Sequence, residues 1–152
     1  MTTRSRILLA VFAVLIAPQL PALADGGMQS FSNNATDPTF LAGKKAIDAK
    51  DWKKAISIFN GIRAADADVL NYVGYAQRNL GNYDDAINSY RRALVMDSDH
   101  RGANEYIGEA YLLMNNLALA ERHLAALSRI CGPGCEEYKD LAREVAEYKK
   151  KH

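Results

Sequence analysis

The sequence lacks the residue patterns that enzymes of this size use for chemistry. Its 152 residues hold three histidines, His100, His123 and His152, which are scattered along the chain. It contains no Ser-x-Gly nucleophile elbow, no glycine-rich phosphate loop and no His-Glu-x-x-His zinc motif. Because a catalytic site needs several such groups gathered in one cleft, we expect no enzymatic activity, no resident metal and no cofactor.

The chain also lacks an excess of charge of either sign. Nineteen lysines and arginines stand against 18 aspartates and glutamates, which gives a formal net charge of +1. Loss of an N-terminal segment with Arg4 and Arg6 would leave 17 against 18, a net charge of −1. Binding to nucleic acid or to an anionic membrane surface depends on a basic excess, so we expect neither partner.

An apolar run long enough to span a membrane is missing as well. Arg4 and Arg6 precede an uncharged apolar run at residues 7–17, two prolines break it, and residues 22–24 (Ala-Leu-Ala) offer a small-x-small cleavage site. A transmembrane helix needs about 20 apolar residues. The pattern therefore predicts a secretory signal peptide over residues 1–24, with an uncleaved membrane anchor as the less favoured alternative.

The segment after this signal predicts the compartment and a leader. The residue directly after Ala24 is Asp25 and not cysteine, so a lipid-attachment signal is missing. We expect a periplasmic or secreted protein that starts at Asp25 and has no stable membrane insertion after cleavage. Residues 25–35 are polar and carry glycine, which favours a flexible leader. Asp37-Pro38 then predicts a helix cap followed by proline in the first turn.

One residue pattern occurs three times in the rest of the chain. Each copy has a glycine, an alanine twelve residues later, and large apolar residues three before and four after that alanine. The glycines are Gly43, Gly74 and Gly108; the alanines are Ala55, Ala86 and Ala120; the apolar residues are Trp52, Tyr83, Leu117, Phe59, Tyr90 and Leu124. Such an internal repeat predicts an array that buries its core between neighbouring units and leaves an extended surface for a partner.

Each copy is expected to form a helical hairpin. In the second copy the apolar residues of segment 83–94 recur with the 3.6-residue period of a helix. Gly81 is expected to end the first helix in a left-handed conformation, with Asn115 in the same role in the third copy. Asn82, Asp51 and Asn116 are expected to cap the second helices.

The small residues have a packing role in this prediction. We expect Gly74 and Gly108 to let the two helices of a hairpin approach closely, with Ala86 and Ala120 receiving them.

This pattern resembles the tetratricopeptide repeat. The second copy matches best, through LNYVGYAQRNLGNYDDAINSYRRALVMDSD. The resemblance implies an all-α, right-handed superhelix of three hairpins, at residues 36–66, 67–100 and 101–130. The first copy is three residues short, so we expect a tight loop at residues 61–66. Fold alone does not fix function.

The resemblance also implies where a partner would bind. In this family the first helix of each hairpin lines the concave surface. Transferred to this sequence, that surface would be lined by Phe40, Lys44, Asn71, Tyr75, Arg78, Glu105, Glu109 and Leu112. Tyrosine and arginine are common at binding hot spots, so Tyr75 beside Asn71 and Arg78 is a candidate peptide-docking patch; the alternative is a solvated helix face.

The charges of these residues change along the expected groove. Lys44 and Arg78 are basic, whereas Glu105 and Glu109 are acidic. A bound segment is therefore expected to place its acidic part near the first repeat and its basic part near the third. The two glutamates would repel a terminal carboxylate, so a partner with an acidic C-terminus is not expected.

Residues 131–152 are expected to form a Cys-x3-Cys turn and a capping helix from Glu136 to about residue 150. Apolar residues at spacings of 3, 4 and 3 give that helix one apolar face, as the end of a repeat array requires. Cys131 and Cys135 are the only cysteines, and such a pair in an oxidising compartment predicts a disulfide. A copper or redox role is the sharper alternative, because two thiolates suit Cu(I), and free thiols are the third.

Taken together, these features predict a periplasmic adaptor that binds a segment of a protein or peptide partner of the cell envelope in its concave groove. The alternative is a thiol-based metal or redox accessory protein that uses Cys131 and Cys135. The identity of the partner and the oligomeric state do not follow from the sequence.

Overall fold

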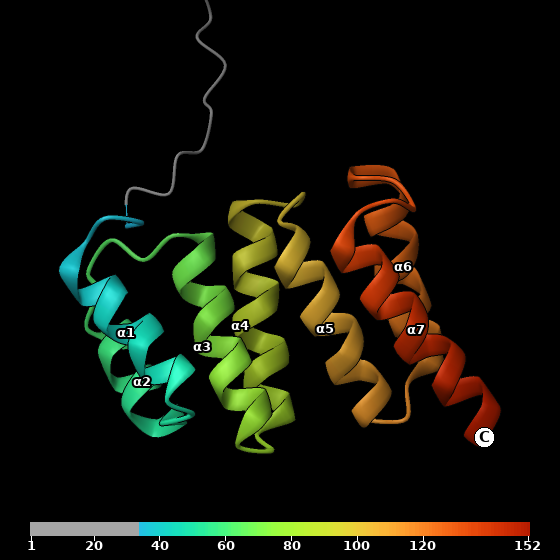
Figure 1. Ribbon diagram of the computed structural model, residues 1–152, viewed down its shortest axis with the longest axis horizontal. Coiled ribbons are helices and arrows are strands. Elements are labelled where there is room, and N and C mark those ends of the chain that lie inside the picture. The colour runs from blue at the N-terminus through green and yellow to red at the C-terminus, as the bar shows by residue number, and fades with distance from the viewer. Residues whose placement is uncertain (1–33) are drawn as a thin grey trace, which may run out of the picture. The chain divides into compact units, whose positions relative to one another are not determined.

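The computed structural model describes residues 34–152, which fold into seven α-helices with no strand among them (Figure 1). The helices are α1 (Pro38–Asp48), α2 (Trp52–Asn60), α3 (Ala67–Asn79), α4 (Tyr83–Met96), α5 (Arg101–Leu113), α6 (Leu117–Ile130) and α7 (Glu136–Lys151). The expected signal peptide, residues 1–24, and residues 25–33 of the expected leader lie outside the described residues. None of the helices within residues 34–152 is long and apolar enough to cross a membrane.

The packed domain begins earlier than the sequence predicted. Asn34, inside the expected flexible leader, is buried, and its side-chain amide donates a hydrogen bond of 3.0 Å to the carbonyl of Ala64. Its own carbonyl accepts from the backbone N–H of Asp37 at 2.9 Å. Asn34 is therefore part of the packed domain and not of a flexible leader, because it ties the start of α1 to the loop that precedes α3.

The helices pair as three hairpins and a closing helix. Helices α1 and α2, α3 and α4, and α5 and α6 pack as neighbours, and each pair also contacts the first helix of the next. Helix α7 packs on both α5 and α6, as expected of a capping helix. Leu141 and Val145 of its apolar face are buried, while its outer face is charged.

Short-range capping chemistry starts and ends most helices as the sequence predicted. Gly81 (φ 81°) and Asn115 (φ 57°) both adopt the left-handed conformation expected of them. The side chain of Asp51 accepts a hydrogen bond from the backbone N–H of Lys54 at 3.3 Å, and that of Asn116 from the backbone N–H of Leu119 at 3.2 Å. Each donor is the third residue of its helix. Asn82 occupies the capping position of α4, but its side chain makes no capping hydrogen bond.

The repeat glycines make room for large side chains rather than for the repeat alanines. A Cβ atom at Gly43 would lie 2.5 Å from the ring of Phe59, and one at Gly74 would lie 2.6 Å from the ring of Tyr90. The expectation that Ala86 receives Gly74 was therefore wrong, because the aromatic residue one turn later on α4 occupies that space. Each hairpin of the first two repeats is closed by an aromatic ring packed against a glycine.

The third hairpin is closed in a different way. A Cβ atom at Gly108 would lie 2.5 Å from a methyl group of Leu141 on α7. The equivalent of Phe59 and Tyr90 in this repeat is Leu124, which is only half-buried. Leu141, which is fully buried, thus fills from α7 the position that an aromatic residue fills from inside the first two hairpins.

The three missing residues of the first repeat shorten a helix and not a loop. Helix α2 has 9 residues, whereas α4 and α6 have 14 each. The loop that follows α2 spans residues 61–66, longer than the connection at 97–100 after α4. The expected tight loop was therefore wrong, because α2 ends more than one turn early, with Gly61 as its C-cap.

Helices α1, α3, α5 and α7 form an inner layer, and α2, α4 and α6 form an outer layer. Along the inner layer each helix contacts the next, whereas no two of the described outer helices approach within 8 Å between Cα atoms. Because the inner helices lie closer together than the outer helices, the array curves toward the inner layer. The inner layer is therefore the concave face, and Figure 1 shows the hairpins in chain order along it.

Candidate functional site

The residues expected to line the groove do lie on inner-layer helices, but half of them are buried. Phe40, Asn71, Glu105 and Leu112 are each less than a tenth exposed, Tyr75, Arg78 and Glu109 are half-buried, and Lys44 is exposed. The helix period places a residue on a face but does not show how closely the next helix approaches. Phe40, for example, packs edge-on against Phe59 and Tyr72, with ring centroids 5.7 and 5.6 Å away.

An ion pair joins the second and third repeats at the centre of the concave face. The guanidinium of Arg78 on α3 pairs with the carboxylate of Glu109 on α5, and the two side chains are 15% and 16% exposed. Their charges cancel within the groove. The expected gradient from basic to acidic is therefore not present between these two residues, because they neutralise each other.

Tyrosine rings hold this ion pair in place. The Arg78 guanidinium carbon lies 5.5 Å from the ring centroid of Tyr75 and 5.2 Å from that of Tyr106. The two rings are 5.1 Å apart, and Tyr75 also packs against Trp52 of the first repeat at 5.9 Å. Because aromatic faces attract cations, these contacts fix the guanidinium at the surface of the groove.

A second row of residues on this face was missed by sequence reasoning. Tyr72 and Tyr106 each stand two residues before a repeat glycine, and Leu41 holds that place in the first repeat. Leu41 is 51% exposed, and the ammonium of Lys44 lies 5.8 Å from the ring centroid of Tyr72. The equivalence of the three positions was a signal that could have placed them in the groove.

Glu105 is the most perturbed carboxyl group of the concave face. Burial raises its pKa to about 7, with the carboxylates of Asp140 and Glu137 on α7 adding to the rise and Arg78 opposing it. Burial also raises the pKa of the neighbouring Tyr106 to about 12. The end of the groove between α5 and α7 is therefore acidic, because both helices place carboxyl groups there.

A pocket of about 460 Å³ lies in the concave face next to the ion pair. Its walls come from three inner helices, with Arg78 on α3, Leu113 on α5, and Glu144 and Tyr148 on α7. Leu113 is 53% exposed, so it offers an apolar contact to a bound segment. The contribution of α7 could not be read from the repeats, because this helix lies outside them.

Comparisons with known proteins agree with this geometry. Residues 67–100 match the family described as "Tetratricopeptide repeat". Residues 67–100 are a tetratricopeptide repeat. The comparison with curated proteins finds no match.

Several solved structures share the fold of most of this chain. The Yersinia enterocolitica type III secretion translocator chaperone SycD aligns with a TM-score of 0.69 and 20% identity, over 80% of this chain and 88% of that chain. SycD in complex with a peptide of the translocator YopD aligns with a TM-score of 0.64 and 22% identity, over 74% and 88%. The second tetratricopeptide repeat domain of human RPAP3, in complex with an HSP70 peptide, aligns with a TM-score of 0.64 and 18% identity, over 73% and 92%. At these identities the likeness shows the fold.

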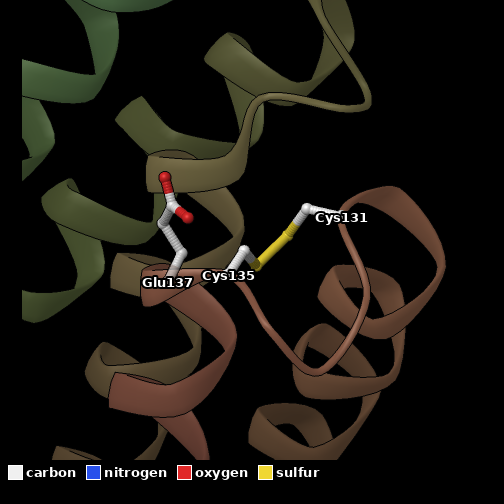
Figure 2. A group of neighbouring side chains, drawn as sticks. All are labelled: Cys131, Cys135 and Glu137. Carbon is white, nitrogen blue, oxygen red and sulfur yellow. A yellow bond between two sulfur atoms is a disulfide. The ribbon is translucent and has the colours of Figure 1, made fainter.

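The turn after the last hairpin holds a disulfide between Cys131 and Cys135, whose Cα atoms are 5.9 Å apart (Figure 2). A carboxylate oxygen of Glu137 lies within 4.8 Å of both sulfur atoms. The same carboxylate pairs with Arg101 of α5 at 3.5 Å. In this state the sulfur atoms bond each other and offer no thiolate to a metal, while the turn joins α6 to α7.

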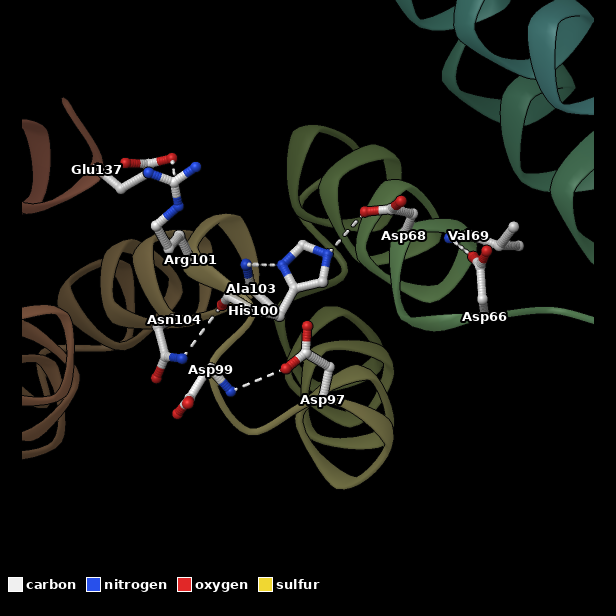
Figure 3. A network of polar contacts seen from close by, with 10 residues as sticks. All are labelled: Asp66, Asp68, Val69, Asp97, Asp99, His100, Arg101, Ala103, Asn104 and Glu137. Carbon is white, nitrogen blue, oxygen red and sulfur yellow. Dashed lines mark hydrogen bonds and ion pairs between the residues drawn. The ribbon is translucent and has the colours of Figure 1, made fainter. Parts of the chain in front are cut away.

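Polar contacts fix the inner helices of successive hairpins to each other. His100 accepts a hydrogen bond from the backbone N–H of Ala103 through Nδ1 at 3.1 Å, which leaves Nε2 to donate to Asp68 at 2.9 Å (Figure 3). The next residue, Arg101, pairs with Glu137. The starts of α3, α5 and α7 are thereby connected, so the inner layer is held at a defined spacing.

Proposed function

We propose that the protein is an interaction adaptor that binds a segment of a partner protein along its concave face. The observation that carries the proposal is the pocket between α3, α5 and α7, where exposed Leu113 lies beside the tyrosine-clamped ion pair of Arg78 and Glu109. An apolar contact surrounded by fixed polar groups is the arrangement that gives both affinity and orientation in binding sites.

The similar solved structures support this proposal. SycD is described in complex with a peptide of YopD, and the second tetratricopeptide domain of RPAP3 in complex with an HSP70 peptide. These proteins present a peptide-binding surface on the same fold. They do not identify the partner of this chain, because fold is shared more widely than ligand.

The chemistry of the pocket favours a segment with apolar and basic side chains. Within this pocket Arg78 pairs with Glu109, and Lys151 pairs with Glu147 at 4.0 Å. Glu144 of α7 also lines the pocket, and Glu105 lies nearby on α5, so an acidic excess remains at this end. Opposite charges across an interface speed association and orient the partner. The basic part of the segment is therefore proposed to lie at the α5–α7 end.

A substitution in the pocket tests the proposal. Leu113→Lys places a charge on the apolar wall and should abolish capture of the partner from a cell-envelope extract. Met96→Lys is the matched control, because Met96 is similarly exposed at 57% but lies on α4 in the outer layer. Both variants should melt like the wild type. Equal capture by both variants would show that the concave pocket is not the binding surface.

We also propose that the protein acts in the periplasm or outside the cell. The signal-like sequence at residues 1–24 and a disulfide that needs an oxidising compartment support this. Fractionation of producing cells, with N-terminal sequencing of the purified protein, tests it. Asp25 as the first residue is the expected result, and a cytoplasmic chain that keeps residues 1–24 would contradict the proposal.

The disulfide is proposed to have a structural role, and copper binding or redox chemistry is the alternative. Reduction would free two soft thiolates that suit Cu(I), with Glu137 as the nearest further group. A free-thiol assay with metal analysis on protein from the periplasm separates the two. Stoichiometric copper on reduced protein, lost in the variant with Cys131→Ser and Cys135→Ser, would favour the alternative.

A further inference from the structure

The outer layer holds a second pocket, on the face opposite the concave groove. It has a volume of about 600 Å³ and lies between α4 and α6, with α5 beneath it. Three arginines line it: Arg91 on α4 and Arg122 and Arg129 on α6. The described residues that line this pocket include neither aspartate nor glutamate. The pocket therefore gathers three positive charges without a negative one.

These outer-layer arginines differ from Arg78 and Arg101 of the inner layer in having no ion-pair partner among the described residues. Arg78 and Arg101 pair with carboxylates, whereas no ion pair within residues 34–152 involves Arg91, Arg122 or Arg129. Arg91 donates a hydrogen bond of 2.8 Å to the hydroxyl of Tyr111, which orients its guanidinium without supplying a negative charge. Guanidinium groups bind phosphate and carboxylate in a two-point geometry.

The rest of the pocket is apolar. Ile107 of α5 is buried and Leu94 of α4 is half-buried. Leu119 and Ala126 line the α6 side, and Val95 is 87% exposed. The volume falls in the range of small-molecule sites, about 300–1,000 Å³. A suitable ligand would place an anionic group among the guanidiniums and an apolar part against these apolar residues.

The pKa of His123 depends on the charge within this pocket. The side-chain nitrogen of Asn104 donates to the carbonyls of Ser98 and His100, so its oxygen accepts from Nδ1 of His123 at 3.0 Å. The neutral ring then leaves Nε2 as an acceptor. Burial, together with the charges of Arg122 and Arg91, lowers the pKa of His123 to about 4. An anion bound here would counteract those charges and raise that pKa.

We propose that the outer pocket binds a phosphate group carried on a small apolar body. Arg91, Arg122 and Arg129 bind the phosphate, and the α5 side of the pocket receives the apolar part. A doubly charged phosphate matches three guanidiniums better than a single carboxylate does, because more of the positive charge is compensated. The phosphate could belong to a free organic phosphate or to a lipid headgroup.

Calorimetric titration with hexyl phosphate, inorganic phosphate and hexanol tests the site. Hexyl phosphate should bind more tightly than inorganic phosphate, and hexanol should not bind. Arg122→Gln and Arg129→Gln should each weaken hexyl phosphate binding about tenfold or more, the loss typical of one charge-assisted contact. Arg92→Gln is the matched control, because this exposed arginine is on α4 but does not line the pocket. The affinity of this variant for hexyl phosphate should stay within about twofold of that of the wild type.

A nuclear magnetic resonance titration of His123 gives a second measurement that does not depend on the variants. Its pKa should rise from about 4 when hexyl phosphate saturates the protein. Sedimentation with phosphatidylglycerol vesicles, against phosphatidylcholine vesicles, identifies the source: co-sedimentation that Arg122→Gln abolishes indicates a lipid headgroup, and its absence indicates a free phosphate. No heat with millimolar hexyl phosphate, equal weakening by Arg92→Gln, or an unchanged His123 pKa would each overturn the proposal.

Discussion

Replacement of Glu105 by glutamine is expected to stabilise the protein at pH 8 and to have little effect at pH 4.5. Glu105 is only 8% exposed on α5. Burial raises its pKa to about 7, and the carboxylates of Asp140 and Glu137 on α7 raise it further against the opposing charge of Arg78. Glutamine has nearly the shape of the protonated side chain but carries no charge at any of these pH values.

The size of the effect follows from the pKa. A rise from the ordinary 4.5 to about 7 corresponds to at most about 3 kcal/mol, at about 1.36 kcal/mol per unit. The side chains of Glu137 and Asp140 are 23% and 31% exposed, so solvent screens part of their repulsion. The expected gain at pH 8 is therefore about 1–2 kcal/mol.

The sign of the pH dependence is also fixed. Because the folded protein binds this proton more tightly than the unfolded chain, the stabilising contribution of Glu105 is complete below pH 4.5. It is lost as the pH rises from about 4.5 to 7, and above pH 7 it stays lost. The glutamine variant should lack this fall in stability.

Urea unfolding followed by circular dichroism at pH 4.5, 6 and 8 provides the measurement. The difference between variant and wild type isolates Glu105 and its interactions with neighbouring charges, since titrating groups far from it contribute equally to both. Glu109→Gln on the same helix is the control, and it should destabilise the protein at pH 8 because Arg78 loses its partner. A difference for Glu105→Gln that is independent of pH, or largest at pH 4.5, would refute the reasoning.

Three further predictions concern packing, the disulfide and pH. Gly74→Ala should lower the free energy of unfolding by about 1–3 kcal/mol, because the added Cβ atom would lie 2.6 Å from an aromatic ring of α4. Gly134→Ala is the control: its Cβ atom would meet no atom within 4 Å, so the variant should be neutral in the same urea assay. The double variant with Cys131→Ser and Cys135→Ser should lose about 2 kcal/mol in a thermal melt and still bind its partner. The lowered pKa of His123, about 4, means that its contribution to stability is present above pH 6.5 and is lost as the pH falls toward 4; His123→Gln should remove that loss.

The hairpins were predictable because short-range chemistry determines them. Gly81 and Asn115 end helices in the left-handed conformation, and Asp51 and Asn116 cap the helices that follow. These effects act over two to four residues, so they can be read directly from the sequence. The capping helix was predictable for the same reason, since one apolar face and terminal charges of the right sign define it.

The site was less predictable because it depends on how closely separate helices approach. The period of a helix assigned Asn71 and Glu105 to the concave face, but the next inner helix buries both. The pairing of Arg78 with Glu109 joins residues 31 positions apart, and single-residue reasoning treated their charges as independent. The pKa of Glu105 could not be foreseen, because it depends on carboxylates of α7 whose register against α5 no repeat pattern specifies.

Helix α7 links the stability of the array to its proposed function. Through Leu141 it fills the space above Gly108 that Leu124 does not fill, and through Glu144 and Tyr148 it lines the concave pocket. A segment bound in that pocket contacts α7 only while the helix is docked, so binding must stabilise the docked state by mass action. Loss of the disulfide removes the covalent cross-link between α6 and α7 but leaves Leu141 and Val145 of α7 buried, so the helix should stay docked and the double variant should still bind. The thermal melt of the double cysteine variant with and without bound partner therefore tests this coupling directly.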